Sequence, residues 1–170
     1  MDLKSMVRSV PDFPQKGVIF RDITPLLQDP EGLQNSIDAL YERLKDEEFD
    51  YIIGPESRGF IFGVPLAYKM KKGFIPVRKA GKLPYKTKQK EYDLEYGTSI
   101  IEMHVDAIQP GQKVVIVDDL LATGGTSKVM VDLIEAMGGQ VVKLVYLIEL
   151  EFLNGREQLE KYKIESVIQY

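Results

Sequence analysis

Two adjacent carboxylates, Asp118 and Asp119, precede a turn of small residues, and this combination could bind a phosphorylated sugar. The turn, residues 122–126, reads Ala-Thr-Gly-Gly-Thr, so an anion can approach its backbone N–H groups closely. A helix expected to follow adds the positive end of its dipole. Carboxylates cannot bind the phosphate itself, but they suit sugar hydroxyls, directly or through a hydrated divalent cation. The pattern therefore predicts one ligand that carries both a diol and a phosphate.

Other structures could give the same motif. An acidic pair alone is often a solvated turn or a helix N-cap. A P-loop ATPase would need a lysine in the turn, and residues 122–126 contain none. A receiver-type signalling domain carries its acidic pair near the start, whereas Asp118 lies about two-thirds along the 170 residues. The ATPase and the receiver domain are therefore disfavoured.

A second strand end carries Glu56, Ser57 and Arg58, within the run Gly-Pro-Glu-Ser-Arg-Gly. Ser57 and neighbouring amides could bind one end of a pyrophosphate, and Arg58 could pair with it through two N–H groups. A serine that caps a helix explains these residues equally well. Between positions 69 and 90 the chain has nine lysines and arginines and no acidic residue, which indicates an anionic ligand nearby.

Length and composition are typical of one cytoplasmic domain. The chain has 170 residues and no cysteine, which excludes disulfides and thiolate zinc sites, and its one histidine, His104, is expected to be an ordinary strand residue. The net charge of −4 argues against broad nucleic-acid binding, which usually needs a basic face. The first residues lack an apolar signal-peptide core, and no apolar run approaches the ~18 residues of a membrane span. We therefore expect a single cytoplasmic domain over residues 1–170 that binds neither nucleic acid nor a membrane.

Strands and helices alternate along the chain, and they must position these motifs. Apolar residues at helical spacing and the pair Asp29-Pro30 predict a long helix at 30–44. Further helices are predicted at 59–70, 126–137 and 155–162, and strands at 51–53, 74–77, 98–104, 114–117, 141–148 and 166–169. This alternation predicts an α/β fold with a mostly parallel, twisted sheet flanked by helices.

Taken together, the motifs resemble those of the type I phosphoribosyltransferases, which use 5-phosphoribosyl 1-pyrophosphate (PRPP), and most closely their adenine-specific branch. Matching runs follow the family order over nearly the whole chain, at 11–14, 17–25, 54–60, 76–84, 94–97 and 118–126. The resemblance implies Mg²⁺-dependent transfer of the phosphoribosyl group from PRPP to adenine, which gives AMP and pyrophosphate in purine salvage. It also implies a small N-terminal hood at 1–28 that binds adenine, a mobile catalytic loop at 78–97 and a homodimer.

The resemblance also implies a role for individual residues. PRPP and AMP are expected to contact Asp118, Asp119, Ala122, Thr123, Gly124, Gly125 and Thr126. Pyrophosphate is expected to contact Glu56, Ser57, Arg58, Arg78, Lys79 and Lys82. Adenine is expected to contact Ile19, Phe20, Arg21 and Leu150. The catalytic residues implied are Arg58, Glu95, which handles a proton on the adenine ring, and Tyr96, near the ribose and leaving group. Mg²⁺ is expected to be held mainly by PRPP and water, with no direct protein ligand.

Several alternatives stay open beside the resemblance. In several other branches an aspartate that handles the proton of the base stands where this chain has Ala122, so another carboxylate, Glu95, must do so here. A guanine- or xanthine-type enzyme is disfavoured by Ala122 and by the Glu95-Tyr96 pair. A PRPP-sensing regulator usually carries an added DNA-binding segment or a basic RNA-binding face. Segment 78–97 could instead be a solvated hairpin with lysines on an edge strand, and Ile19 and Phe20 could be plain core.

Overall fold

The computed structural model describes residues 1–93 and 97–170, and its centre is a seven-stranded sheet. The strands are β3 (Tyr51–Pro55), β4 (Gly73–Lys79), β5 (Thr87–Asp93), β6 (Thr98–His104), β7 (Lys113–Leu121), β8 (Gln140–Glu149) and β9 (Ile164–Gln169). Their order across the sheet is β5-β6-β4-β3-β7-β8-β9. Within this sheet, as far as the described residues go, the neighbouring strands from β4 to β9 pair parallel, and β6 pairs antiparallel with β4 and β5. The predicted α/β fold with a mostly parallel sheet is confirmed.

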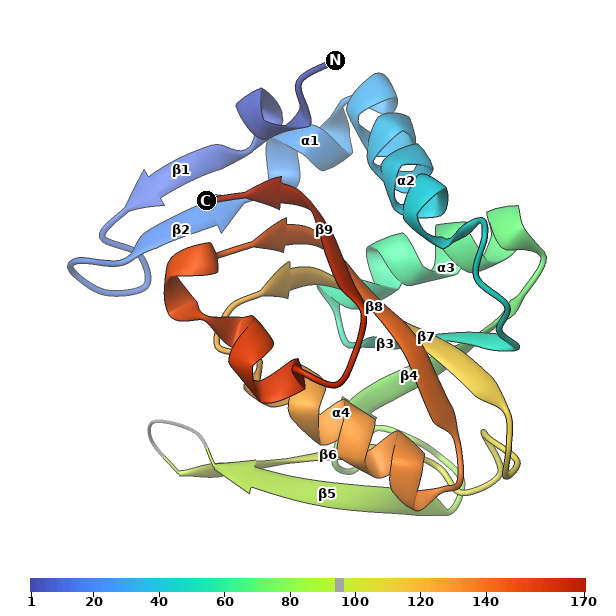
Figure 1. Cartoon of the computed structure of the whole chain (residues 1–170). Coiled ribbons are helices and arrows are strands. Elements are labelled where there is room, and N and C mark those ends of the chain that lie inside the picture. Colours follow the sequence, from blue (N-terminus) through green and yellow to red (C-terminus); the bar gives the residue numbers. More distant parts are fainter. Residues whose placement is uncertain (94–96) are drawn as a thin grey trace.

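Helices cover both faces of this sheet. They are α1 (Thr24–Gln28), α2 (Pro30–Leu44), α3 (Arg58–Met70) and α4 (Gly125–Ala136), with 3₁₀ turns at Leu3–Met6, Glu151–Leu153 and Gly155–Leu159. The helix α2 begins where predicted, because the Asp29 side chain accepts a hydrogen bond from Gly32 N at 2.8 Å and Pro30 fits the first turn. Helices α2 and α3 lie on one face and α4 on the other (Figure 1). The predicted helix at 155–162 is only the short 3₁₀ turn.

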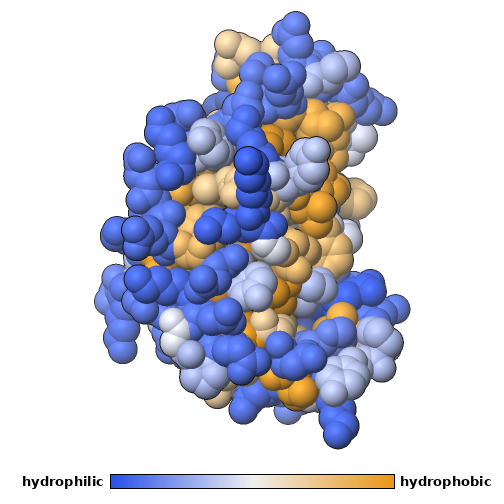
Figure 2. Space-filling view, turned by 90° about the vertical axis from the view of Figure 1, so that its right-hand side faces the viewer, coloured by the Kyte–Doolittle hydropathy of each residue, from blue (hydrophilic) through white to orange (hydrophobic). Residues whose placement is uncertain are grey.

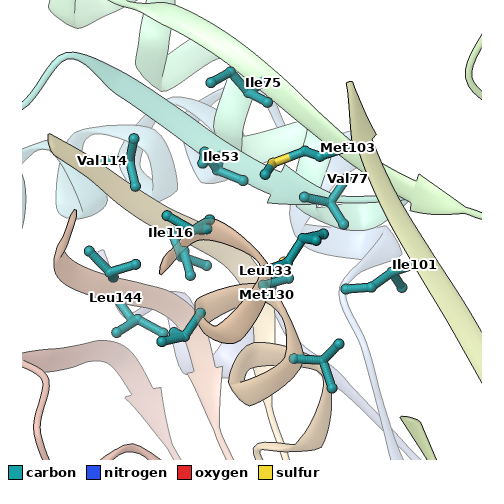
Figure 3. Packing of buried hydrophobic residues seen from close by; sticks show 14 of the residues in the cluster. Ile53, Ile75, Val77, Ile101, Met103, Val114, Ile116, Met130, Leu133 and Leu144 are labelled. Atoms are coloured by element: carbon teal, nitrogen blue, oxygen red, sulfur yellow. The ribbon is translucent and has the colours of Figure 1, made fainter. Parts of the chain in front are cut away.

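The two faces of the sheet form two apolar cores. Alternate residues of β7 point to opposite faces, with Val114 and Ile116 in the core under α4 and Val115 and Val117 in the core under α2 and α3. Met130 and Leu133 of α4 pack among the strand residues of the first core (Figure 3). Because both faces of β7 are buried, its sequence is a continuous apolar run rather than an alternation. This rigid strand carries the acidic pair.

A small two-stranded unit stands beside the main sheet. Its antiparallel strands are β1 (Arg8–Pro11) and β2 (Ile19–Asp22), and it lies next to the ends of β8 and β9 (Figure 1). The chain termini lie at the same side of the molecule (Figure 1). No helix in the described part of the chain is long and apolar enough to cross a membrane.

Two predicted segments differ from the structure. The strand expected at 114–117 continues to Leu121, because β8 goes on pairing with it as far as Glu149, so the acidic pair lies inside the strand rather than after it. In the segment 78–97, Arg78 and Lys79 end β4, and Thr87–Asp93 form β5. The strand β5 is at the sheet edge with mostly exposed side chains, so it lacks the apolar alternation that marks a strand in the sequence. Residues 87–93 thus form a hairpin strand paired with β6, and the mobile catalytic loop at 78–97 stays a prediction.

Candidate active site

A cavity of about 490 Å³ opens where β3 and β7 end. The parallel strands deliver their carboxyl ends to the same edge of the sheet, which is where ligands bind in such folds. Most of the residues expected to bind PRPP or pyrophosphate line it, namely Glu56, Ser57, Arg58, Lys79, Asp118, Asp119 and residues 122–126. Residues from two distant parts of the sequence thus share one cavity.

The turn at 122–126, here called the phosphate turn, forms one end of the cavity. Gly124 has a φ of +86° and is the N-cap of α4, and Gly124 O accepts the hydrogen bond of Lys128 N at 2.9 Å. The free N–H groups of the first helical turn and the helix dipole favour an anion at this end. Beneath it, the hydroxyls of Ser127 and Tyr146 are 2.5 Å apart and buried. The turn therefore combines a rigid floor with backbone donors.

The acidic pair forms the wall next to the phosphate turn. Asp119 is only 8% exposed, and its Oδ2 lies 2.6 Å from Nε of Arg58. Asp119 N donates to the Asp118 carboxylate at 2.7 Å. Desolvation and the neighbouring Asp119 charge raise the pKa of Asp118 well above its usual value. The wall thus presents one carboxylate paired with a cation and a second that resists ionisation.

The turn after β3 forms the other end of the cavity. The Glu56–Ser57 peptide bond is cis. The Glu56 carboxylate accepts hydrogen bonds from Arg78 Nε at 3.2 Å and from the backbone N of Lys79 at 2.8 Å. Through these two bonds Glu56 holds the end of β4 beside the cavity, and its expected contact with pyrophosphate stays a prediction. Arg78 and Lys82 are not among the lining residues, so the structure does not bring these two expected residues into the cavity.

A second cavity, of about 150 Å³, adjoins the first. It is lined by Val18, Ile19, Phe20, Arg21, Arg58, Asp119, Leu120, Ile148 and Leu150. All four residues expected to contact adenine are present, so β2 and Leu150, which follows β8, meet here. Arg58 and Asp119 line both cavities. A ligand in the apolar cavity would therefore lie next to the acidic pair.

Tyr170 holds Arg21, the β2 residue at this second cavity, and the sequence did not indicate this role. The guanidinium of Arg21 stacks on the Tyr170 ring at 3.9 Å, and Arg21 Nη1 donates to Ser9 Oγ at 2.6 Å. The rings of Phe13 and Phe20 meet edge to face at 5.3 Å. Leu120 and Ile148 were missed as lining residues too, because in the sequence they are indistinguishable from core strand residues. No local signal marks Tyr170, which lies far from Arg21 in the sequence.

Glu102 of β6 is a further residue that the sequence analysis missed. It is only 2% exposed, and its carboxylate accepts from Gly81 N, Leu83 N, Thr87 Oγ1 and Gln89 Nε2 at 2.8–3.2 Å. Every donor belongs to the segment that joins β4 to β5 or to β5 itself. Glu102 therefore fixes the course of the lysine-bearing segment that leaves the cavity edge at Lys79.

Replacing Glu102 by glutamine is expected to lower the free energy of unfolding near neutral pH by about 2 kcal/mol, because a buried acceptor of several bonds becomes partly a donor. Burial raises the pKa of Glu102, but the bonds from Gln89, Leu83, Thr87 and Gly81 outweigh it, so the pKa is lowered from 4.5. The stabilisation is therefore full above pH 4.5 and is lost as the pH falls through the lower folded value. Urea denaturation over this pH range measures it. An equal loss in Glu91→Gln, on the exposed face of β5, would contradict this account.

Glu95 and Tyr96, the two residues expected to assist the chemistry, lie outside the described residues. Their roles rest on the sequence alone.

Comparisons with known proteins identify the class that this fold and site define. The family profile described as phosphoribosyl transferase domain matches residues 22–169, so the chain belongs to the phosphoribosyltransferase family. The adenine phosphoribosyltransferase of Acetivibrio thermocellus is 60% identical over 171 residues, which cover 100% of both chains. Within the family, the chain belongs to the adenine phosphoribosyltransferases, and these are pentosyltransferases.

Solved structures agree with this assignment. The crystal structure of adenine phosphoribosyltransferase from Thermoanaerobacter pseudethanolicus superposes with a TM-score of 0.96 at 52% identity and covers 99% of this chain and 98% of that chain. The enzyme of Saccharomyces cerevisiae, complexed with an imino-altritol bisphosphate and adenine, gives a TM-score of 0.92 at 39% identity and covers 98% and 96%. The similarity extends over nearly the whole chain.

Proposed function

We propose that this chain transfers the 5-phosphoribosyl group from PRPP to adenine, in a Mg²⁺-dependent reaction that yields AMP and pyrophosphate for purine salvage. The observation that carries the proposal is the pair of adjoining cavities that share Arg58 and Asp119. One cavity has donors at both ends and carboxylates between them. The other is largely apolar and suits a flat base. A transferase that joins a base to a phosphorylated sugar needs this juxtaposition.

PRPP would lie along the larger cavity. Its 5-phosphate would occupy the phosphate turn, where backbone N–H groups and the helix dipole favour an anion. The ribose hydroxyls would donate to the carboxylates of Asp118 and Asp119. The pyrophosphate would reach the turn at Ser57, with Arg58 and Lys79 as its cations. To bind the pyrophosphate, Arg58 would break its ion pair with Asp119 and form a new one with the pyrophosphate.

Adenine would occupy the smaller cavity between Ile19, Phe20 and Leu150. Its amino group and ring nitrogen could be read by a backbone C=O and N–H in the hood, because a base with the wrong donor pattern would leave buried groups unpaired. The yeast enzyme, which is similar over nearly the whole chain, was crystallised with adenine. The stacked pair Arg21 and Tyr170 would keep the hood closed over the base.

The reaction is a substitution at the anomeric carbon. A ring nitrogen of adenine forms the new C–N bond while the C–O bond to pyrophosphate breaks, through an oxocarbenium-like state. The site must therefore stabilise separating charge more than supply a nucleophile. Arg58 and Lys79 would stabilise the leaving pyrophosphate, and Asp119 would face the positive ribose. Glu95 would handle the proton on the adenine ring, because Ala122 has no group that can do so.

Magnesium fits the donors at this site only in part. Asp118 and Asp119 offer carboxylate oxygens, the ligand type that Mg²⁺ prefers. Within residues 1–93 and 97–170, no group of three or more His, Asp or Glu side chains could hold a metal ion. We therefore propose that the ion is held mainly by PRPP and water, with the acidic pair at the edge of its hydration shell. When bound, Mg²⁺ would neutralise charge on the leaving pyrophosphate.

The reaction is tested by chromatography of AMP formed from adenine and PRPP, with Mg²⁺ and again with an excess of chelator. We expect AMP and pyrophosphate in equal amounts with Mg²⁺ and almost none with the chelator. Glu95→Gln is expected to reduce turnover while adenine still binds. No AMP from the wild-type protein in the presence of Mg²⁺ would overturn the proposed function.

We also propose that the chain forms a homodimer through the outer face of α3. Ile61, Val64 and Tyr68 lie one or two helical turns apart and are 37%, 48% and 87% exposed, so they form an apolar stripe on this helix. Figure 2 shows apolar surface gathered in the middle of the face that lies to the right in Figure 1, the side at which α3 ends. Such a stripe favours burial against a second copy.

Val64→Glu is therefore expected to shift the protein from dimer to monomer in sedimentation at micromolar concentration. A charge at this position would have to be buried without a partner in the dimer. The matched control is Val105→Glu, because Val105 is 45% exposed but lies after β6, away from α3. A wild-type monomer, or a Val64→Glu protein that stays dimeric, would contradict the interface.

A further inference from the structure

The phosphate turn is packed against the 3₁₀ turn Gly155–Leu159, and the contact is backbone against backbone. A Cβ atom on Gly155 would lie 2.5 Å from Ala122 O, and one on Gly124 would lie 2.5 Å from Gly155 O. Real side chains do not approach a carbonyl oxygen so closely. Both positions therefore need glycine for the two segments to touch.

The side chain of Gln158, in the same 3₁₀ turn, binds the peptide group between Thr123 and Gly124. Gln158 Nε2 donates to Thr123 O at 2.7 Å. The Ala122 and Thr123 carbonyls thus both point toward the 155–159 segment. In a trans peptide group the C=O and the following N–H point in opposite directions. The N–H groups of Thr123 and Gly124 are therefore directed away from that segment, as an anion site built from backbone donors requires.

The 155–159 segment is itself fixed by an ion pair between Arg156 and Glu149. Arg156 donates from Nε and Nη2 to the two carboxylate oxygens of Glu149, each at 2.8 Å, and Ser166 Oγ donates to the same carboxylate at 2.7 Å. Such a two-bond pair sets orientation as well as position. Glu149 ends β8 and is almost fully buried, so the clamp ties the segment to the main sheet.

We propose that Gly155 and Gln158 are positioning residues that set the affinity for the phosphate end of PRPP by holding two carbonyls of the phosphate turn away from the ligand. This inference rests on the proposed function, since it concerns the same site. The 5-phosphate is remote from the reacting carbon, so loss of this alignment weakens binding of substrate and transition state alike. The effect should appear in KM for PRPP and not in kcat or in KM for adenine.

The test compares Gln158→Ala, Gly155→Ala and the matched control Gln34→Ala, on the exposed side of α2. For Gln158→Ala we expect KM for PRPP to rise about threefold to tenfold, as for the loss of one hydrogen bond. For Gly155→Ala we expect a rise of about tenfold or more, because the phosphate turn itself must shift. In both, kcat and KM for adenine should change by less than about twofold, and Gln34→Ala should resemble the wild type in every parameter.

Gln158 is exposed, so its variant should fold even if Gly155→Ala does not. Thermal denaturation without ligand shows which variants are folded. A folded Gln158→Ala protein with unchanged KM for PRPP would overturn the inference while leaving the function intact. A fall in kcat with unchanged KM for PRPP would overturn it too. A wild-type protein that does not consume PRPP with any base would overturn the proposed function and the inference together.

Discussion

The double variant Asp118→Asn/Asp119→Asn is expected to have a kcat/KM for PRPP about 1,000-fold below that of the wild type. Each carboxylate would accept a charge-assisted hydrogen bond from a ribose hydroxyl, worth about 1.5–3 kcal/mol, and each 1.4 kcal/mol is about tenfold. Asparagine keeps the shape but removes the charge that faces the developing oxocarbenium ion. Initial rates at several PRPP concentrations measure the change. The matched control is Asp38→Asn, whose carboxylate pairs with Lys69 on the surface and should matter little.

Measuring the stability of Asp118→Asn distinguishes a loss of activity at the site from a loss of activity caused by damage to the fold. Because the pKa of Asp118 is raised in the folded state, the folded protein pays for its ionisation once the pH exceeds the usual value of 3.8. Asp118→Asn alone should therefore be at least as stable as the wild type near neutral pH, with an advantage that grows as the pH rises above 3.8. It should still lose activity. A double variant within about tenfold of the wild type in kcat/KM would contradict the role of the pair.

Gly124→Ala is expected to lower kcat/KM for PRPP by about 100-fold, because displacement of a positioning group by about 1 Å can cost that much. Gly124 has a φ of +86°, and an added Cβ would lie 2.5 Å from Gly155 O. The phosphate turn must therefore move. Steady-state kinetics with PRPP varied at saturating adenine measure the effect.

The matched control for this variant is Gly111→Ala. Gly111 has nearly the same φ, +87°, but nothing lies within 4 Å of its added Cβ. It should lose a similar amount of stability from backbone strain, of the order of 1 kcal/mol, and keep its activity. If Gly111→Ala and Gly124→Ala lose activity equally, the close contact with Gly155 is not what positions the turn.

The parts of the fold that are visible in the sequence are those with local signals. Asp29-Pro30 marks the start of α2, and the apolar run before Asp118 marks β7, because capping and burial on both faces leave patterns within a few residues. The strand β5 has no such pattern, since one edge of it is unpaired and its side chains face water. Its pairing with β6 is decided by residues such as Glu102, which are distant in the sequence.

In the candidate site, too, the sequence shows the residues that belong to local motifs but not the contacts between distant motifs. The resemblance to the family motifs predicts that Ile19, Phe20 and Leu150 contact the same ligand, and in the structure they line one cavity. It does not show that Arg58 pairs with Asp119 or that Glu56 binds the end of β4, because these contacts join different strand ends. The clamp of Glu149 and Arg156 leaves no recognisable pattern either. Such contacts between distant segments become visible only once the chain is folded.

The central claim is most directly tested by pyrophosphate release when the purified protein meets PRPP and Mg²⁺ with adenine, hypoxanthine, guanine or xanthine in turn. We expect turnover with adenine and a kcat/KM at least about 100-fold lower for each oxopurine, because their donor pattern leaves buried backbone groups unpaired. Turnover with oxopurines rather than adenine would contradict the assignment of the smaller cavity to adenine. Binding of PRPP without turnover on any base would contradict the enzymatic role itself.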